Sequence, residues 1–88
     1  MIKELTLESV ETLATEEKQL VLFNDDYNSF DWVILSLVET CGHTQQQAAQ
    51  CAWIVHFKGK YAVKSGSEKD LEPRCTALLE RGLKAEIQ

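Results

Sequence analysis

The stretch QLVLFNDDYNSFDWVILSLVETC, residues 19–41, carries the two signals that decide the fold. Its first six residues form a short apolar run of β-favouring side chains, which stops at an acidic turn. Both faces of this run are apolar, so we predict a central strand covered by helices. Asn28 or Ser29 can then cap a helix, along which apolar residues recur at the i, i+3, i+4, i+7 spacing. A strand followed by an amphipathic helix is therefore expected.

The remaining elements are predicted from helix caps and from glycines placed just after a helix. Outward from the first stretch, the expected elements are helices at 30–41 and 44–58, a strand at 61–64 followed by a turn at 65–66, a helix opened by Ser67 and ended by Gly82, and a strand at 83–87. Pro73 is expected near the start of that last helix, where its missing amide does no harm. The order β-α-α-β-α-β with short links predicts an α+β domain, in which three helices pack on a small, mostly antiparallel three-stranded sheet.

The length and charge of the chain limit the kinds of function open to it. The 88 residues suit one domain, predicted at 18–88, preceded by a flexible N-terminal arm at 1–17. A net charge of −5 argues against nucleic-acid binding. The chain lacks the apolar runs of a signal peptide or a membrane span, so we expect a cytoplasmic protein without membrane contact, and a monomer. Its three cysteines form no CxxC pair and are interpreted as reduced apolar side chains.

A polar cluster at the end of the first strand is the candidate for chemistry. Asn24 offers a carbonyl oxygen, Asp25 a carboxylate and neutral His56, near the end of the second helix, one lone pair. A turn with a capping histidine explains the same residues without any ligand. If the three acceptors converge, they match the three donors of an ammonium group, and an apolar pocket beside them would bind the attached side chain. Since only neutral histidine accepts a hydrogen bond, binding is then expected to weaken in acid.

Metal and catalytic interpretations of these residues are weaker. Asp25, Asp26 and His56 could bind a divalent metal, but adjacent carboxylates at a strand end usually point apart, so no metal or other cofactor is expected. Cys51 and His56 lie on different faces of one helix, which disfavours a nucleophilic pair and hence an enzyme. Two tryptophans, Trp32 and Trp53, are expected in the core, and His43 in a solvated loop.

Two motifs at a matching distance resemble one known family. The run LVLFNDDYNSFDWV at 20–33 is similar to the signature of the ClpS adaptors, and VHFKGK at 55–60 is similar to the V-H-x-x-G-K at the end of their second helix. The closing GLKAEI at 82–87 also resembles that family, so the likeness covers residues 19–88. It implies a fold shared with the C-terminal domain of the ribosomal stalk protein, and it implies an adaptor rather than an enzyme.

The resemblance also implies a ligand, a partner and site residues. ClpS adaptors bind N-degron substrates with a large hydrophobic N-terminal residue (Phe, Leu, Tyr or Trp) and deliver them to a Clp-type AAA+ protease through the N-terminal domain of its Hsp100 unfoldase. The α-amine would then be bound by Asn24, Asp25 and His56. The matching side-chain pocket consists of Leu22, Phe30, Val33, Ala52, Val55 and Leu83.

The chain departs from the family pattern at several positions. Phe30 replaces a methionine at the pocket mouth, Ala52 replaces a bulky residue, and Asn28 and Ser29 replace threonine and proline. The stretch at 64–71 is shorter than usual, and it contains Glu68 and Lys69, the candidate residues for docking on the unfoldase. The alternative is a scaffold or interaction domain with the same fold and no terminal-amine pocket.

Overall fold

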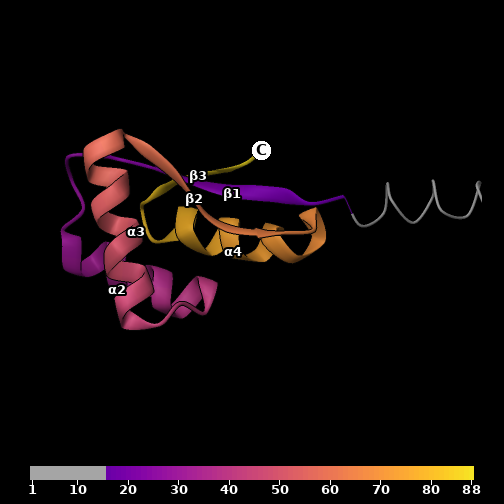
Figure 1. The fold of residues 1–88 in the computed structure, drawn as a ribbon, viewed down its shortest axis with the longest axis horizontal. Helices are drawn as coiled ribbons and strands as arrows, with labels where there is room; N and C mark the ends of the chain where they lie inside the picture. The colour runs from indigo at the N-terminus through magenta and orange to yellow at the C-terminus, as the bar shows by residue number, and fades with distance from the viewer. Residues whose placement is uncertain (1–15) are drawn as a thin grey trace, which may run out of the picture.

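The computed structural model describes residues 16–88, and the predicted arm at 1–17 lies almost entirely outside this range. The elements, in chain order, are β1 (Lys18–Phe23), α2 (Phe30–Cys41), α3 (Gln45–Lys58), β2 (Lys60–Gly66), α4 (Glu68–Glu80) and β3 (Lys84–Ile87). Figure 1 shows α4 running along the strands, with α2 and α3 packed together at one end of the sheet. The predicted α+β fold, with three helices and three strands in the order β-α-α-β-α-β, is confirmed.

The sheet has the order β2-β1-β3, and both pairs of strands are antiparallel. The apolar run at residues 19–24 therefore forms most of β1, which is the central strand, as predicted. A bulge in the β1–β2 pair, between Leu20 and Val21, shifts the register of β2. In β2 the side chain of Val63 is buried in the core. Such a bulge bends its strand and strengthens the local twist, so the strand can wrap around a small core.

The core lies between one face of the sheet and the helices. Leu20 and Leu22 point from β1 into it, and they meet Leu37 of α2 and Leu78 of α4, all of them at most 1% exposed. The apolar stripe predicted for α2 is the face that packs. Leu35, which does not belong to this stripe, is 44% exposed.

Each helix begins at a side-chain cap that the sequence contains. The Ser29 hydroxyl accepts a hydrogen bond from the amide of Trp32, so Ser29, rather than Asn28, caps α2. Thr44 and Gln47 form the predicted capping box of α3. In α4 the Ser67 hydroxyl accepts from the amide of Asp70. These bonds satisfy amides that have no partner inside the helix, and they fix where each helix starts.

Four predictions about local structure are wrong. Trp32 and Trp53 are on the surface, 36% and 52% exposed. In α2 the Trp32 Nε1 donates to the carbonyl oxygen of Arg81, and α3 packs through Ala48, Ala52 and Val55, which leaves Trp53 outside its packed face. The turn expected at 65–66 is part of β2, which stays paired with β1 to its end. Pro73 lies within α4, well beyond the first turn. His43 is partly buried, and its Nε2 lies 2.8 Å from the carbonyl oxygen of Val63.

Across residues 16–88, no helix combines the length and the apolar character needed to cross a membrane.

Candidate functional site

The order of the strands brings three distant segments to one end of the sheet. Phe23, the last residue of β1, pairs with Lys60 at the start of β2 and with Lys84 at the start of β3. The residue after β1 continues the pairing, because the amide of Asn24 donates to the carbonyl oxygen of Gly59 at 2.9 Å. This bond holds Asn24 beside the C-terminal end of α3, the helix turn that carries His56. The predicted convergence of Asn24 and His56 therefore has a backbone cause.

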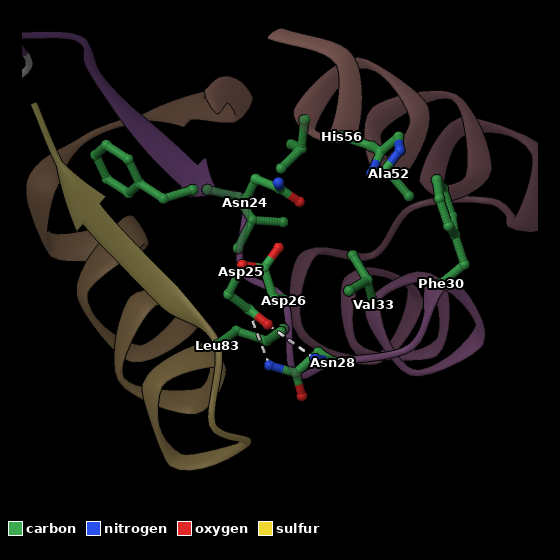
Figure 2. Close-up of a pocket in the computed structure, with 12 residues that line it drawn as sticks. Asn24, Asp25, Asp26, Asn28, Phe30, Val33, Ala52, His56 and Leu83 are labelled. Atoms are coloured by element: carbon green, nitrogen blue, oxygen red, sulfur yellow. Dashed lines mark hydrogen bonds between the residues drawn. The ribbon is translucent and has the colours of Figure 1, made fainter. Parts of the chain in front are cut away.

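The loop between β1 and α2 is built around the Asp25 carboxylate. Its Oδ1 accepts hydrogen bonds from the amides of Tyr27 (2.9 Å) and Asn28 (2.8 Å), and its Oδ2 accepts from Asn28 Nδ2 at 2.9 Å. Asn28 Nδ2 also donates to the carbonyl oxygen of Gly82, at 3.0 Å. Figure 2 shows the bonds between Asp25 and Asn28. Asn28 thus links the loop to the segment that carries Leu83.

These contacts lower the pKa of the Asp25 carboxyl below its ordinary value. Partial burial, the largest single influence, acts in the opposite direction and raises this pKa, but the hydrogen bonds from Asn28 and Tyr27, with the positive charge of Lys84, together outweigh it. Asp25 therefore stays ionised at neutral pH, and a fixed negative charge lies at the end of β1.

We expect Asn28→Ala to destabilise the fold by about 1–2 kcal/mol at neutral pH, because the charged Asp25 loses a side-chain donor. The pKa of Asp25 should rise toward its ordinary value. A carboxyl with a lowered folded pKa stabilises the fold above its unfolded pKa, and this stabilisation is lost as pH falls through the folded pKa. The difference between wild type and variant should therefore shrink in acid.

Urea unfolding at several pH values, with an NMR titration of the Asp25 carboxyl, measures both effects. Tyr27→Ala is the matched control, since the Tyr27 side chain is 95% exposed and only its backbone amide binds Asp25. A variant Asn28→Ala with an unchanged Asp25 pKa would contradict this description of the loop.

The opposite wall of the site comes from the two packed helices. Phe30 and Val33 lie in the first turns of α2, and Ala52, Val55 and His56 lie in the second half of α3. In Figure 2, Phe30, Val33, Ala52 and His56 lie across the cavity from Asn24 and Leu83. Ala52 is buried, 4% exposed, and lines the cavity. Its small side chain leaves space at this position.

The two walls enclose a cavity of about 260 Å³. The cavity is lined by Leu22, Phe23, Asn24, Asp25, Asp26, Asn28, Phe30, Val33, Ala52, Val55, His56 and Leu83. All nine residues expected to bind the amine or to form the side-chain pocket are in this set, so the structure brings them together. Phe23, Asp26 and Asn28 were not predicted as site residues. The acidic pair at the end of the first strand could have indicated that Asp26 belongs to the site. Nothing in the sequence indicates the contact between Asn28 and Gly82.

The cavity combines hydrogen-bond acceptors with an apolar interior. Asn24 and His56 are exposed at its edge, and Asp25 is half-buried. The hydrogen bonds of the loop already engage both oxygens of Asp25. Within the described part of the chain, the Asp26 carboxylate accepts no hydrogen bond, and it also lines the cavity. An arrangement with fixed negative charge, neutral acceptors and an adjoining apolar hollow can bind a cationic group that carries an apolar side chain.

Other candidate residues lie apart from this cavity. Glu68 and Lys69 are exposed in the first turn of α4 and do not line it. Among residues 16–88, no group of three metal-binding side chains is close enough to hold an ion. Cys41, Cys51 and Cys75 are free, and burial raises the pKa of each thiol, which disfavours the thiolate that a nucleophile needs.

Comparisons with known proteins identify a family and a shared fold. The model of one protein family, described as "ATP-dependent Clp protease adaptor protein ClpS", matches residues 14–86. Among solved structures, the chain resembles Agrobacterium tumefaciens ClpS2 bound to L-phenylalaninamide, with a TM-score of 0.75 and 19% sequence identity over 82% of this chain and 94% of that chain. At this identity the likeness shows a shared fold. No curated protein matches the chain.

Proposed function

Because the chain belongs to the ClpS family of ATP-dependent Clp protease adaptors, we propose that it binds N-degron substrates through a free α-amino group and a large hydrophobic N-terminal side chain. The family resemblance stated from residues 20–33 and 55–60 is thereby confirmed. The proposal concerns which ligand the chain binds and its delivery of substrates to a Clp-type protease. In it, Asn24, Asp25 and His56 bind the ammonium group, and Leu22, Phe30, Val33, Ala52, Val55 and Leu83 surround the side chain.

One observation carries this proposal: a single cavity is lined by all nine of these residues. Its volume of about 260 Å³ is slightly below the roughly 300–1,000 Å³ of sites for drug-sized molecules, so it suits one large side chain. The ammonium group would donate to Asn24 Oδ1 and to neutral His56, close to the negative charge of Asp25. An acetylated terminus has no charge and fewer donors, so it would satisfy this set poorly.

The ligand of the structural neighbour combines the same two features, a free amine and a large apolar side chain. L-Phenylalaninamide, bound to Agrobacterium tumefaciens ClpS2, carries a free α-amine and a phenylalanine side chain. We extend this chemistry to substrates of the present chain that begin with Phe, Leu, Tyr or Trp. Delivery to the N-terminal domain of a Clp-type unfoldase is part of the proposal, with Glu68 and Lys69 as docking residues and residues 1–17 as an arm engaged during transfer.

His56 gives the proposal a test that separates binding from folding, because its side chain is exposed. We expect His56→Phe to weaken binding of a peptide with N-terminal phenylalanine by about 10- to 150-fold, which corresponds to one hydrogen bond to a charged group. Phenylalanine retains an aromatic ring beside Phe30 and Phe57 but provides no acceptor. His56→Gln, which retains an acceptor, should lose less affinity.

Isothermal titration calorimetry with one peptide measures its affinity for wild type, His56→Phe and His56→Gln. Thermal unfolding checks that the variants fold. Wild-type affinity in His56→Phe would refute the acceptor role of His56. No binding of the peptide to the wild-type chain would favour a scaffold or interaction domain with the same fold.

A further inference from the structure

Three neighbouring aromatic side chains on α2 and α3 form a surface that we call the aromatic ridge: half-buried Phe30 and exposed Trp53 and Phe57. The ring centroids of Phe30 and Trp53 lie 4.7 Å apart. Those of Trp53 and Phe57 lie 5.3 Å apart with an interplanar angle of 14°, so the two rings are stacked. Trp53 is 52% exposed and Phe57 75% exposed. The rings thus support one another and leave a broad apolar area open to solvent.

The core does not need this ridge. The residues of α3 that pack inward are Ala48, Ala52 and Val55, whereas Trp53 and Phe57, four residues apart, share the outward face. No other described aromatic ring or cation lies over either of them beyond Phe30 and His56. Large aromatic side chains that gather on a surface without supporting the core mark an interaction site more often than isolated exposed residues do.

The ridge shares its rim with the proposed ligand cavity. Phe30 lines the cavity and contacts Trp53. His56 also lines the cavity, and its ring centroid lies 6.3 Å from that of Trp53 and 5.4 Å from that of Phe57. Figure 2 shows Phe30 and His56 on the helical side of the cavity, opposite Leu83. A chain that leaves the cavity on this side must pass over the ridge.

Ligand geometry identifies what the ridge binds. The cavity has room for one side chain, so the second and later residues of a peptide lie outside it. An extended chain advances about 3.3–3.6 Å per residue, so the next two residues lie within about 7 Å of the first. The ring centroids of Trp53 and Phe57 lie within the same reach of the cavity-lining rings: Trp53 is 4.7 Å from Phe30, and Phe57 is 5.4 Å from His56.

We propose that the aromatic ridge binds apolar side chains at the second and third positions of the substrate, so that the chain selects a short apolar N-terminal segment rather than one residue. This inference rests on the proposed function of the cavity. It adds a specificity determinant, Trp53, that lies outside the cavity.

The experiment uses calorimetry with peptides that share N-terminal phenylalanine and carry leucine or serine at position two or at position three. Against the wild-type chain, leucine should bind about three- to tenfold more tightly than serine at one or both positions, as expected for partial burial of one leucine. In Trp53→Ser this preference should fall to near unity, and Trp53→Phe should retain most of it. The matched control is Leu79→Ser, which removes a side chain of similar exposure, 51%, from α4.

The outcomes separate this inference from the proposed function. Tight binding that needs the free amine, with no leucine preference at either position, overturns the ridge proposal and leaves the cavity proposal intact. An unchanged preference in Trp53→Ser also overturns it. If Trp53→Ser instead weakens binding to an isolated Clp-type unfoldase N-terminal domain or alters self-association, with peptide preferences unchanged, the ridge belongs to that partner or to a second copy. Failure of every peptide to bind refutes both proposals.

Discussion

Acetylating the α-amino group of a peptide with N-terminal phenylalanine is expected to reduce its affinity for the chain by at least about a hundredfold. Acetylation removes the positive charge and two of three donors, while the side chain that fills the cavity stays the same. Each hydrogen bond to a charged group contributes about 1.5–3 kcal/mol, so losing two gives about 3–6 kcal/mol, a factor of a hundred or more. The Asp25 carboxylate, held ionised by its loop, would also lose its counter-charge.

Fluorescence anisotropy with the free and acetylated forms of one labelled peptide measures this difference. A peptide with N-terminal serine and a free amine is the control for the apolar part of the cavity, and it should bind weakly despite its charge. Equal affinity of the free and acetylated forms would mean that the acceptors at the cavity edge do not recognise an amine.

The second large effect concerns stability. Replacing Leu37 by alanine is expected to lower the free energy of unfolding by about 2–5 kcal/mol, because its side chain is fully buried between α2 and the rest of the core. A domain of this size has a total stability at the low end of roughly 5–15 kcal/mol, so the variant should retain only a small part of it and unfold at a much lower urea concentration than wild type.

Leu35 is the matched control for this substitution, because it lies in the same helix and is 44% exposed. Leu35→Ala should change stability by no more than about 0.5 kcal/mol. Urea unfolding followed by circular dichroism compares the two variants. Similar losses in both would contradict the placement of α2 against the core.

The sequence predicts the helices of this fold well, because each helix is marked at both ends. A cap opens α2, α3 and α4, and Gly42, Gly59 and Gly82, all with positive φ, follow them. The alternation of apolar and polar residues that indicates a strand is a weaker signal than a helix cap, because each strand has only four to seven residues. The predicted second strand is therefore too short. Its continuation to Gly66 depends on pairing with β1, which no local pattern shows.

The sequence indicates most of the residues that line the cavity, but it does not indicate the contacts among them. Asn24 and His56, predicted to converge, line the same cavity, and the backbone bond from Asn24 to Gly59 holds Asn24 beside the end of α3. The role of Asn28, in contrast, depends on a carbonyl oxygen at Gly82, far away in the sequence. A single sequence contains no local signal for such a contact.

The tryptophans show where hydrophobicity alone misleads. Trp53 is among the most apolar residues of α3, and on that ground it was expected in the core. The buried face of α3 consists instead of Ala48, Ala52 and Val55, and Trp53 lies outside that face. Trp53 is therefore exposed beside the cavity, where it forms part of the aromatic ridge.

The most direct measurement for the central claim is an NMR titration of the ¹⁵N-labelled chain with L-phenylalaninamide, with its N-acetylated form as the control. We expect saturable shifts of the amides that surround the cavity, at Asn24, Asp25, Ala52, His56 and Leu83, and much weaker shifts with the acetylated compound. Shifts centred elsewhere, such as the separate hollow between His43 and Cys51, or equal responses to both compounds, would contradict it.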